Sequence, residues 1–304
     1  MNKPDLTVDL AGLVLKNPVM PASGCFGYGR EYAQYYALET LGAVVVKATT
    51  LEPWLGNATP RVTEVRGGML NAIGLANPGL QKVVQEELVW LSTQNVPIIV
   101  NVAGRTEDEY CQVSEAIANC ELAHAVELNV SCPNVKCGGI SFGVDPHVLQ
   151  DLVQMVKRVC ALPLFVKLSP NVTSIGDMAQ AAEQGGADGI SLINTLIGME
   201  INIHRRKPVL ANGIGGLSGP GIKPVAVRMV YQAAKVVSIP IIGMGGIFTG
   251  ADAIEFMMAG ATAVMVGTAN FTDPYACPTI IDQIKEFMVD NAITSLAEIR
   301  GCVL

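Results

Sequence analysis

Charged and aromatic side chains are scarce in this sequence. Only 15% of its 304 residues are charged and 5% are aromatic, whereas 50% are hydrophobic. The core must therefore be built from Val, Ile, Leu, Ala and Met, a mixture typical of a parallel sheet that is buried on both faces. The net charge of −7 provides no basic surface for a polyanion, which argues against nucleic acid as a partner.

Signals of membrane insertion, disulfide bonding and dinucleotide binding are missing as well. No apolar run reaches the ~18 residues of a membrane span, and the N-terminus, MNKPDLTVDL, lacks the apolar stretch of a signal peptide. The eight cysteines show neither a disulfide framework nor CxxC clusters. The glycines at residues 213–219 do not match GxGxxG between a strand and a helix. We therefore expect a cytoplasmic protein with mostly free thiols, no membrane contact and no dinucleotide fold.

Strand patterns alternate with helix patterns along the chain. Strands are predicted at residues 19–22, 43–48, 98–102, 125–129, 164–167, 189–193, 241–243 and 263–266. Helices are predicted at residues 31–41, 80–92, 107–119, 148–159, 175–184, 224–237, 250–258 and 278–291. Thr106, Asp145, Ser174 and Thr249 are suited to cap four of these helices.

Eight successive strand and helix units predict an α/β fold, a (β/α)8 TIM barrel. The length suits one barrel with insertions, so we expect a single domain over residues 1–304. Residues 7–10 and 13–15 flank Ala11-Gly12 and predict a hairpin that closes the bottom of the barrel. Residues 49–79 and 195–223 follow strands and are too long for ordinary loops, which is typical of lids, binding loops or interfaces on the top face.

Polar side chains stand at six of the eight predicted strand ends: Ser23, Lys47, Asn101, Asn129, Lys167 and Asn194. In a parallel barrel these ends meet at the face that binds the ligand. A lysine within an apolar run is costly to bury unpaired, so Lys47 and Lys167 are predicted to face an anionic ligand. The alternative is that each lysine extends its ammonium to solvent from the strand terminus.

The segment AVELNVSCPNVKCGG (residues 125–139) places a thiol, Cys132, directly after a strand and between Asn129 and Asn134. Such a thiol can be a nucleophile, a general base, a metal ligand or a small buried residue. Cys137 lies five positions on, but two thiols without further ligands nearby make neither a zinc nor an iron–sulfur site.

Glycine-rich loops follow the last two predicted strands, in GMGGIFTG (residues 243–250) and VGTAN (residues 266–270). Backbone N–H groups of such loops often bind a phosphate, which fits a phosphorylated substrate or a flavin. Asn71, Asn129, Asn134 and Asn194 add amides whose donors and acceptors match a ring such as a pyrimidinedione. Each asparagine alone could equally be a turn former.

These motifs together resemble the catalytic subunit of the class 1B dihydroorotate dehydrogenases, over essentially the whole chain. The similar motifs are, in order, PASG (21–24), KATT (47–50), NAIGL (71–75), ELNVSCPN (127–134), VKLSPN (166–171), INT (193–195), GGLSGPGIKP (215–224), GMGGI (243–247) and VGTA (266–269). ELNVSCPN is the most specific. Class 2 members carry serine at the position of Cys132, so the thiol indicates class 1.

The resemblance implies one FMN per chain and oxidation of (S)-dihydroorotate to orotate in pyrimidine (UMP) biosynthesis. It assigns the role of catalytic base to Cys132. Substrate contacts are implied for Lys47, Asn71, Ala72, Ile73, Gly74, Leu75, Asn129, Asn194 and Thr195. Flavin contacts are implied for Ser23, Lys47, Ala48, Asn101, Asn129, Lys167, Ile193, Gly219, Gly245, Gly246, Gly267 and Thr268.

The 1B form passes electrons to NAD through a partner subunit that carries FAD and a [2Fe–2S] cluster, so the resemblance implies a heterotetramer of two catalytic and two electron-transfer subunits. No metal is expected on this chain. Three alternatives stay open at this point: a class 1A homodimer that uses fumarate, a non-redox barrel enzyme acting on a phosphorylated metabolite, and a noncatalytic assembly subunit.

Overall fold

The structure is a computed structural model that describes residues 4–130 and 142–304. Its central element is an eight-stranded parallel sheet in the order β3 (Val19–Pro21), β16 (Ala263–Val266), β15 (Ile241–Met244), β10 (Gly189–Leu192), β9 (Leu164–Lys167), β8 (Ala125–Asn129), β7 (Ile98–Val102) and β4 (Val44–Thr49). The N–H of Gly42 donates to the carbonyl of Val19 (2.9 Å), which brings the start of β4 beside β3. The (β/α)8 barrel is confirmed.

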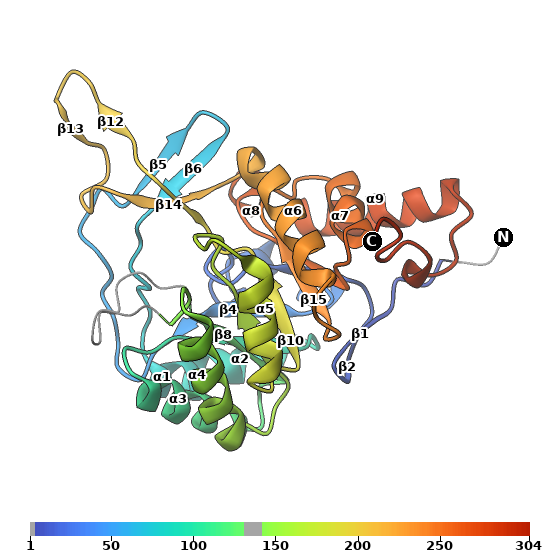
Figure 1. Ribbon diagram of the computed structural model, residues 1–304, viewed down its shortest axis with the longest axis horizontal. Coiled ribbons are helices and arrows are strands. Elements are labelled where there is room, and N and C mark those ends of the chain that lie inside the picture. The colour runs from blue at the N-terminus through green and yellow to red at the C-terminus, as the bar shows by residue number, and fades with distance from the viewer. Residues whose placement is uncertain (1–3, 131–141) are drawn as a thin grey trace.

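Helices follow the strands and cover the outside of the barrel (Figure 1). They are α1 (Leu80–Lys82), α2 (Leu88–Ser92), α3 (Glu107–Asn119), α4 (Pro146–Val159), α5 (Ile175–Gln184), α6 (Lys223–Ala234), α7 (Gly250–Met258), α8 (Ala269–Thr272) and α9 (Ala276–Asp290). A π-helical turn, Val83–Glu87, joins α1 to α2. All four predicted caps are confirmed, because each side-chain oxygen accepts a backbone N–H of its helix.

The prediction of one helix at residues 31–41 is wrong. The segment contains two short 3₁₀ turns, Tyr32–Gln34 and Leu38–Thr40, separated by Ala37 in an extended conformation. Aromatic contacts compete with helix formation here: the Tyr32 ring stacks on Phe26 with centroids 3.9 Å apart. Aromatic residues also have only moderate helix propensity.

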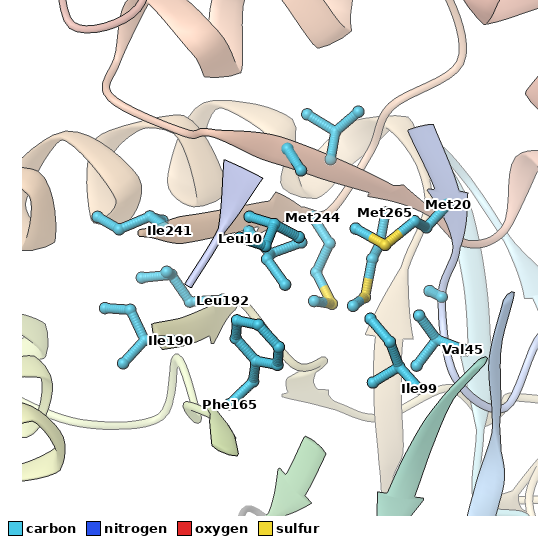
Figure 2. Close-up of a cluster of buried hydrophobic side chains, with 14 of the residues drawn as sticks. Leu10, Met20, Val45, Ile99, Phe165, Ile190, Leu192, Ile241, Met244 and Met265 are labelled. Carbon is cyan, nitrogen blue, oxygen red and sulfur yellow. The ribbon is translucent and has the colours of Figure 1, made fainter. Parts of the chain in front are cut away.

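Apolar side chains fill the lower part of the barrel. Figure 2 shows Met20, Val45, Ile99, Phe165, Met244 and Met265 converging from six strands, together with Leu10. Leu10 belongs to the hairpin of β1 (Val8–Leu10) and β2 (Leu13–Leu15), which confirms the predicted hairpin, and its side chain is fully buried. The hairpin thus helps to close the apolar end of the barrel.

A set of polar residues lies one step above this apolar floor. Side chains two residues apart on a strand share a face, so Lys47 follows Val45, Asn101 follows Ile99 and Lys167 follows Phe165. Register places Glu127 beside Asn101 and Phe165. We call Lys47, Asn101, Glu127 and Lys167 the polar layer.

The two long insertions pair with each other. β5 (Val62–Val65) and β6 (Gly68–Asn71) come from the first, and β11 (Leu196–Gly198) and β14 (Gly215–Ser218) come from the second. They form an antiparallel sheet in the order β11-β14-β6-β5, and β12 (Ile201–Asn202) with β13 (Lys207–Pro208) forms a hairpin at its edge (Figure 1). The register Gly216↔Asn71 brings the insertions together beside the carboxyl ends of the barrel strands.

Within residues 4–130 and 142–304, no helix has both the length and the apolar character needed to cross a membrane.

Candidate active site

Glu127 connects the polar layer. Its carboxylate is fully buried, with Oε1 accepting from Ser23 Oγ (2.9 Å) and Asn101 Nδ2 (2.6 Å), and Oε2 accepting from Ser191 Oγ (2.7 Å). The sequence interpretation missed this residue as part of the site. The sequence did contain a sign of this role: Glu127 lies inside the apolar strand AVELN, and a carboxylate there needs buried partners as much as a lysine does.

Lys167 lies within the barrel, and its side chain is only 6% exposed. Its Nζ donates to Ser23 Oγ (3.1 Å) and lies 4.0 Å from Glu127 Oε1. Extension of this ammonium to solvent is therefore excluded. An internal carboxylate, which the sequence interpretation did not anticipate, already provides part of its counter-charge.

Lys47 is in a different electrostatic position. Burial lowers the pKa of its ammonium, the nearby Cys25 thiol acts in the opposite direction, and the positive charge of Arg61 lowers it further. Within the described parts of the chain, no carboxylate forms an ion pair with Lys47. A partly buried cation of this kind favours an anionic ligand, because such a ligand would replace the solvation lost on folding.

Asn101 carries the clearest sign of an absent partner. The residue is fully buried and its Nδ2 donates to Glu127, while its Oδ1 has no hydrogen-bond donor among the described residues. Buried amide oxygens are normally paired. This atom therefore fits a ligand that offers an N–H or O–H group.

A chain of contacts joins the predicted substrate residues. Asn194 Nδ2 donates to Asn129 Oδ1 (3.3 Å), and Asn194 Oδ1 accepts the N–H of Thr195 (2.8 Å). Gly216 lies so close to Thr195 that a Cβ on Gly216 would collide with the Thr195 side chain. The Gly216 carbonyl accepts a hydrogen bond from Asn71 Nδ2 (3.4 Å). The insertion sheet thus brings Asn71 to the side of the barrel site.

The rest of the predicted substrate segment continues from Asn71. Ala72 is buried, whereas Ile73, Gly74 and Leu75 are half-buried, and both Gly74 (φ 73°) and Leu75 (φ 54°) adopt the left-handed region. The Ile73 carbonyl accepts the N–H of Asn57 (3.0 Å). This segment is therefore a shaped loop held within the first insertion.

The predicted phosphate glycines lie close together. At Gly246, which has φ 78°, an added Cβ would lie 3.0 Å from the Gly219 carbonyl oxygen and 2.9 Å from the backbone nitrogen of Lys223. At Gly245 it would lie 3.3 Å from Ile193 Cγ1. These loops pack on one another without room for side chains, and the Lys223 ion pairs with Asp252 (2.7 Å) and Glu255 (2.8 Å) join α6 to α7 beside them.

Gly267 and Thr268 follow β16 on the neighbouring side of the barrel. Thr268 Oγ1 donates to Ser218 Oγ (2.9 Å), which connects the β16 loop to the insertion sheet. A Cβ at Gly267 would make only ordinary contacts, 3.7 Å from Cys25 Sγ and 3.8 Å from Ala22 Cβ. The buried residues Ala48 and Ile193 complete the predicted flavin set.

Two residues of the predicted site, Cys132 and Asn134, lie outside the described residues, as does Cys137. Asn129, at the end of β8, is the predicted ligand-binding residue that directly precedes them in the sequence among the described residues. Its carbonyl accepts from Tyr110 Oη (2.8 Å), and only 7% of its surface is exposed. The strand that leads to Cys132 is therefore firmly packed at its carboxyl end.

The fold and site define a class of protein: a (β/α)8-barrel enzyme whose buried polar groups and glycine loops surround the carboxyl ends of the strands. The model of the dihydroorotate dehydrogenase family matches residues 5–288. This chain belongs to that family.

Relatives with high identity carry a more specific name. The chain is 60% identical to "Dihydroorotate dehydrogenase B (NAD(+)), catalytic subunit" of Geobacillus kaustophilus, covering 97% of this chain and 95% of the relative. It is also 60% identical to the protein of that name from Halalkalibacterium halodurans, covering 97% of each. A crystal structure of DHODH from Eimeria tenella in complex with ferulenol superimposes with a TM-score of 0.82, 24% identity and coverage of 99% and 89% of the two chains. The last likeness concerns the fold alone.

Proposed function

We propose that this chain oxidises (S)-dihydroorotate to orotate in the synthesis of UMP, as the catalytic subunit of an NAD-linked enzyme. The observation that carries the proposal is the combination, in one polar layer, of a largely buried lysine, Lys47, which has no carboxylate partner among the described residues, and an unpaired buried acceptor at Asn101. Family membership and the name shared by relatives of 60% identity support this reaction over the fumarate-linked form.

The residues present fit FMN. An isoalloxazine ring offers an N–H and a ribityl chain offers hydroxyls, either of which could satisfy Asn101 Oδ1. Gly219, Gly245, Gly246 and Gly267 carry no side chain that would keep a ligand away from the loop backbone, which suits a phosphate. Ser23, Lys47, Ala48, Asn129, Lys167, Ile193 and Thr268 complete the residues that we assign to FMN, one per chain.

FMN, when bound, supplies the acceptor for the hydride that leaves C6 of dihydroorotate. The chain's own residues perform the remaining work. Cys132 takes the C5 proton as general base, while Lys47, the segment of residues 71–75, Asn129, Asn194 and Thr195 bind and orient the substrate. Amide groups suit a neutral ring with alternating N–H and C=O, and the Lys47 ammonium suits its carboxylate.

We further propose that electrons leave through a partner subunit carrying FAD and a [2Fe–2S] cluster, in a heterotetramer of two catalytic and two electron-transfer subunits in the cytoplasm. The words "catalytic subunit" in the names of the relatives support a partner. We also propose that residues 1–304 act as one domain, since one continuous hydrophobic core includes residues from Val8 to Ile299.

One experiment tests the proposed function. The protein is purified from its native source, its flavin is released and identified, and dihydroorotate is added without oxygen while the absorbance is followed. We expect a yellow protein that contains FMN, is bleached by dihydroorotate and copurifies with a second subunit containing iron and FAD. A colourless protein would favour the non-redox barrel enzyme, and FMN without the second subunit would favour the fumarate-linked form.

The Gly267→Ala variant should weaken FMN binding by about tenfold with little change in thermal stability. The new methyl group makes only ordinary protein contacts, so its main effect falls on the space beside the backbone that we assign to the cofactor. FMN affinity is measured by quenching of flavin fluorescence on titration with apo-protein. Gly176→Ala in α5 is the matched control, because its Cβ also meets an ordinary contact, at 3.6 Å from Val236. Equal FMN affinity of the two variants would refute the proposal that FMN lies against the backbone of Gly267.

Asn129→Ala and Asn194→Ala should each weaken orotate binding by ~1–3 kcal/mol, since each leaves a buried polar partner unmet. The two side chains share a hydrogen bond, so the double variant should lose less than the sum of the single losses. Orotate affinity is read from the absorbance change of the bound flavin. If both single variants bind orotate with the affinity of the wild type, the two asparagines have a purely structural role.

A further inference from the structure

Glu127 is buried at the centre of the flavin site that we propose, yet none of the roles assigned above includes it. Its strand neighbours in register are Asn101 on β7 and Phe165 on β9, so the carboxylate lies at the boundary between the apolar floor and the polar layer. A buried carboxylate is costly unless it is paired and hydrogen-bonded. Three donors and the Lys167 ammonium meet that need here.

An ionised carboxylate can only accept hydrogen bonds, and this fixes the orientation of each neighbour. Asn101 must turn its Nδ2 toward Glu127, which leaves the acceptor Oδ1 on the opposite side of the amide, buried and unpaired. Ser23 must direct its hydroxyl hydrogen to Glu127, which leaves its lone pairs to accept from Lys167 Nζ. Glu127 thereby decides which groups of Ser23, Asn101 and Lys167 remain to meet a ligand.

We propose that Glu127 is a positioning residue of the flavin site. It sets the donor and acceptor pattern that the barrel presents to the cofactor, and its negative charge opposes the positive charge of Lys167 beneath that site. Ser191 supports this role from β10 by donating to Oε2, the oxygen that Ser23 and Asn101 do not use. The inference rests on the proposed flavin function.

Two substitutions separate charge and hydrogen-bond pattern from packing. Glu127→Gln keeps the size but removes the negative charge and replaces one acceptor oxygen with a donor. Lys167 then loses its internal counter-charge, and either Ser191 must accept where it now donates or the Asn101 amide must reverse. Glu127→Asp keeps the charge and the acceptor-only character. Glu183→Gln is the matched control, because the Glu183 carboxylate also accepts hydrogen bonds, from Ser238, but on the surface of the protein.

We expect Glu127→Gln to weaken FMN binding to apo-protein at least tenfold. Loss of the negative charge should also shift the equilibrium between oxidised and reduced bound flavin at least tenfold toward the reduced form. This shift equals a rise of about 30 mV in the two-electron potential of the bound flavin. Glu127→Asp should lie nearer to wild type in both measurements, and Glu183→Gln should match wild type. The affinity is measured by flavin fluorescence and the potential by equilibration with a reference dye.

Wild-type affinity and potential in Glu127→Gln would overturn the proposal. Equal losses in Glu127→Asp and Glu127→Gln would also overturn it, because they would indicate packing alone. If Glu127→Gln does not fold, the Ser191→Ala variant tests the proposal instead. We expect Ser191→Ala to bind FMN about threefold more weakly than wild type, and unchanged binding would count against the proposal. A wild-type protein that binds no flavin would refute the proposed function itself, an outcome distinct from all of these.

Discussion

Cys132→Ser should slow the reduction of bound flavin by dihydroorotate by roughly 10²-fold or more, while orotate still binds. This expected loss is the typical contribution of a positioned general base. A hydroxyl gives up its proton far less readily than a thiol, so the residual rate should continue to rise toward higher pH than the wild-type rate does. Stopped-flow absorbance across a pH series measures both effects.

Cys137→Ser is the matched control for that experiment, because it makes the same thiol-to-hydroxyl change five residues away. We expect it to alter neither the rate nor its pH dependence. A large loss in the Cys137 variant combined with near-normal rates in the Cys132 variant would reverse the assignment of the base.

We expect Lys47→Met to weaken FMN binding by about 2–5 kcal/mol, the usual cost of removing one member of a buried charged contact. The same substitution should raise the thermal stability of the apo-protein. Burial lowers the pKa of Lys47 below its ordinary value of 10.5, which means that the folded apo-protein disfavours the charged form of this side chain. FMN affinity and the melting temperature of the apo-protein are the two measurements.

The pH dependence of stability gives a second readout for Lys47. Because its pKa falls on folding, the unfolded chain binds more protons between the folded pKa and 10.5, and the contribution of Lys47 to stability rises with pH through that window. Lys47→Met should remove this rise. Lys82→Met is the control, since the Lys82 side chain lies on α1, is half exposed and pairs with the exposed Glu86. Identical apo-protein stability and FMN affinity in the two variants would refute a ligand role for Lys47.

Local sequence patterns predicted most of the barrel. The eight strands and the caps at Thr106, Asp145, Ser174 and Thr249 depend on neighbouring residues only, and each of these elements is present. The helix at residues 31–41 failed because aromatic packing, including the stacking of Tyr32 on Phe26, outweighs a weak local preference. The secondary structure of such segments is determined by long-range contacts.

For the site, the sequence by itself determined which chemical groups stand at the strand ends, since strand periodicity and the position of each polar residue are local properties. It did not determine that Glu127 would join Ser23, Asn101, Ser191 and Lys167, because their contacts depend on the register between four strands and on the loop after β3. Nor did it determine that the two insertions would share one sheet and bring Asn71 to Gly216. Hydrogen-bond partners far apart in sequence are selected by how the whole barrel closes, and only the tertiary structure holds that information.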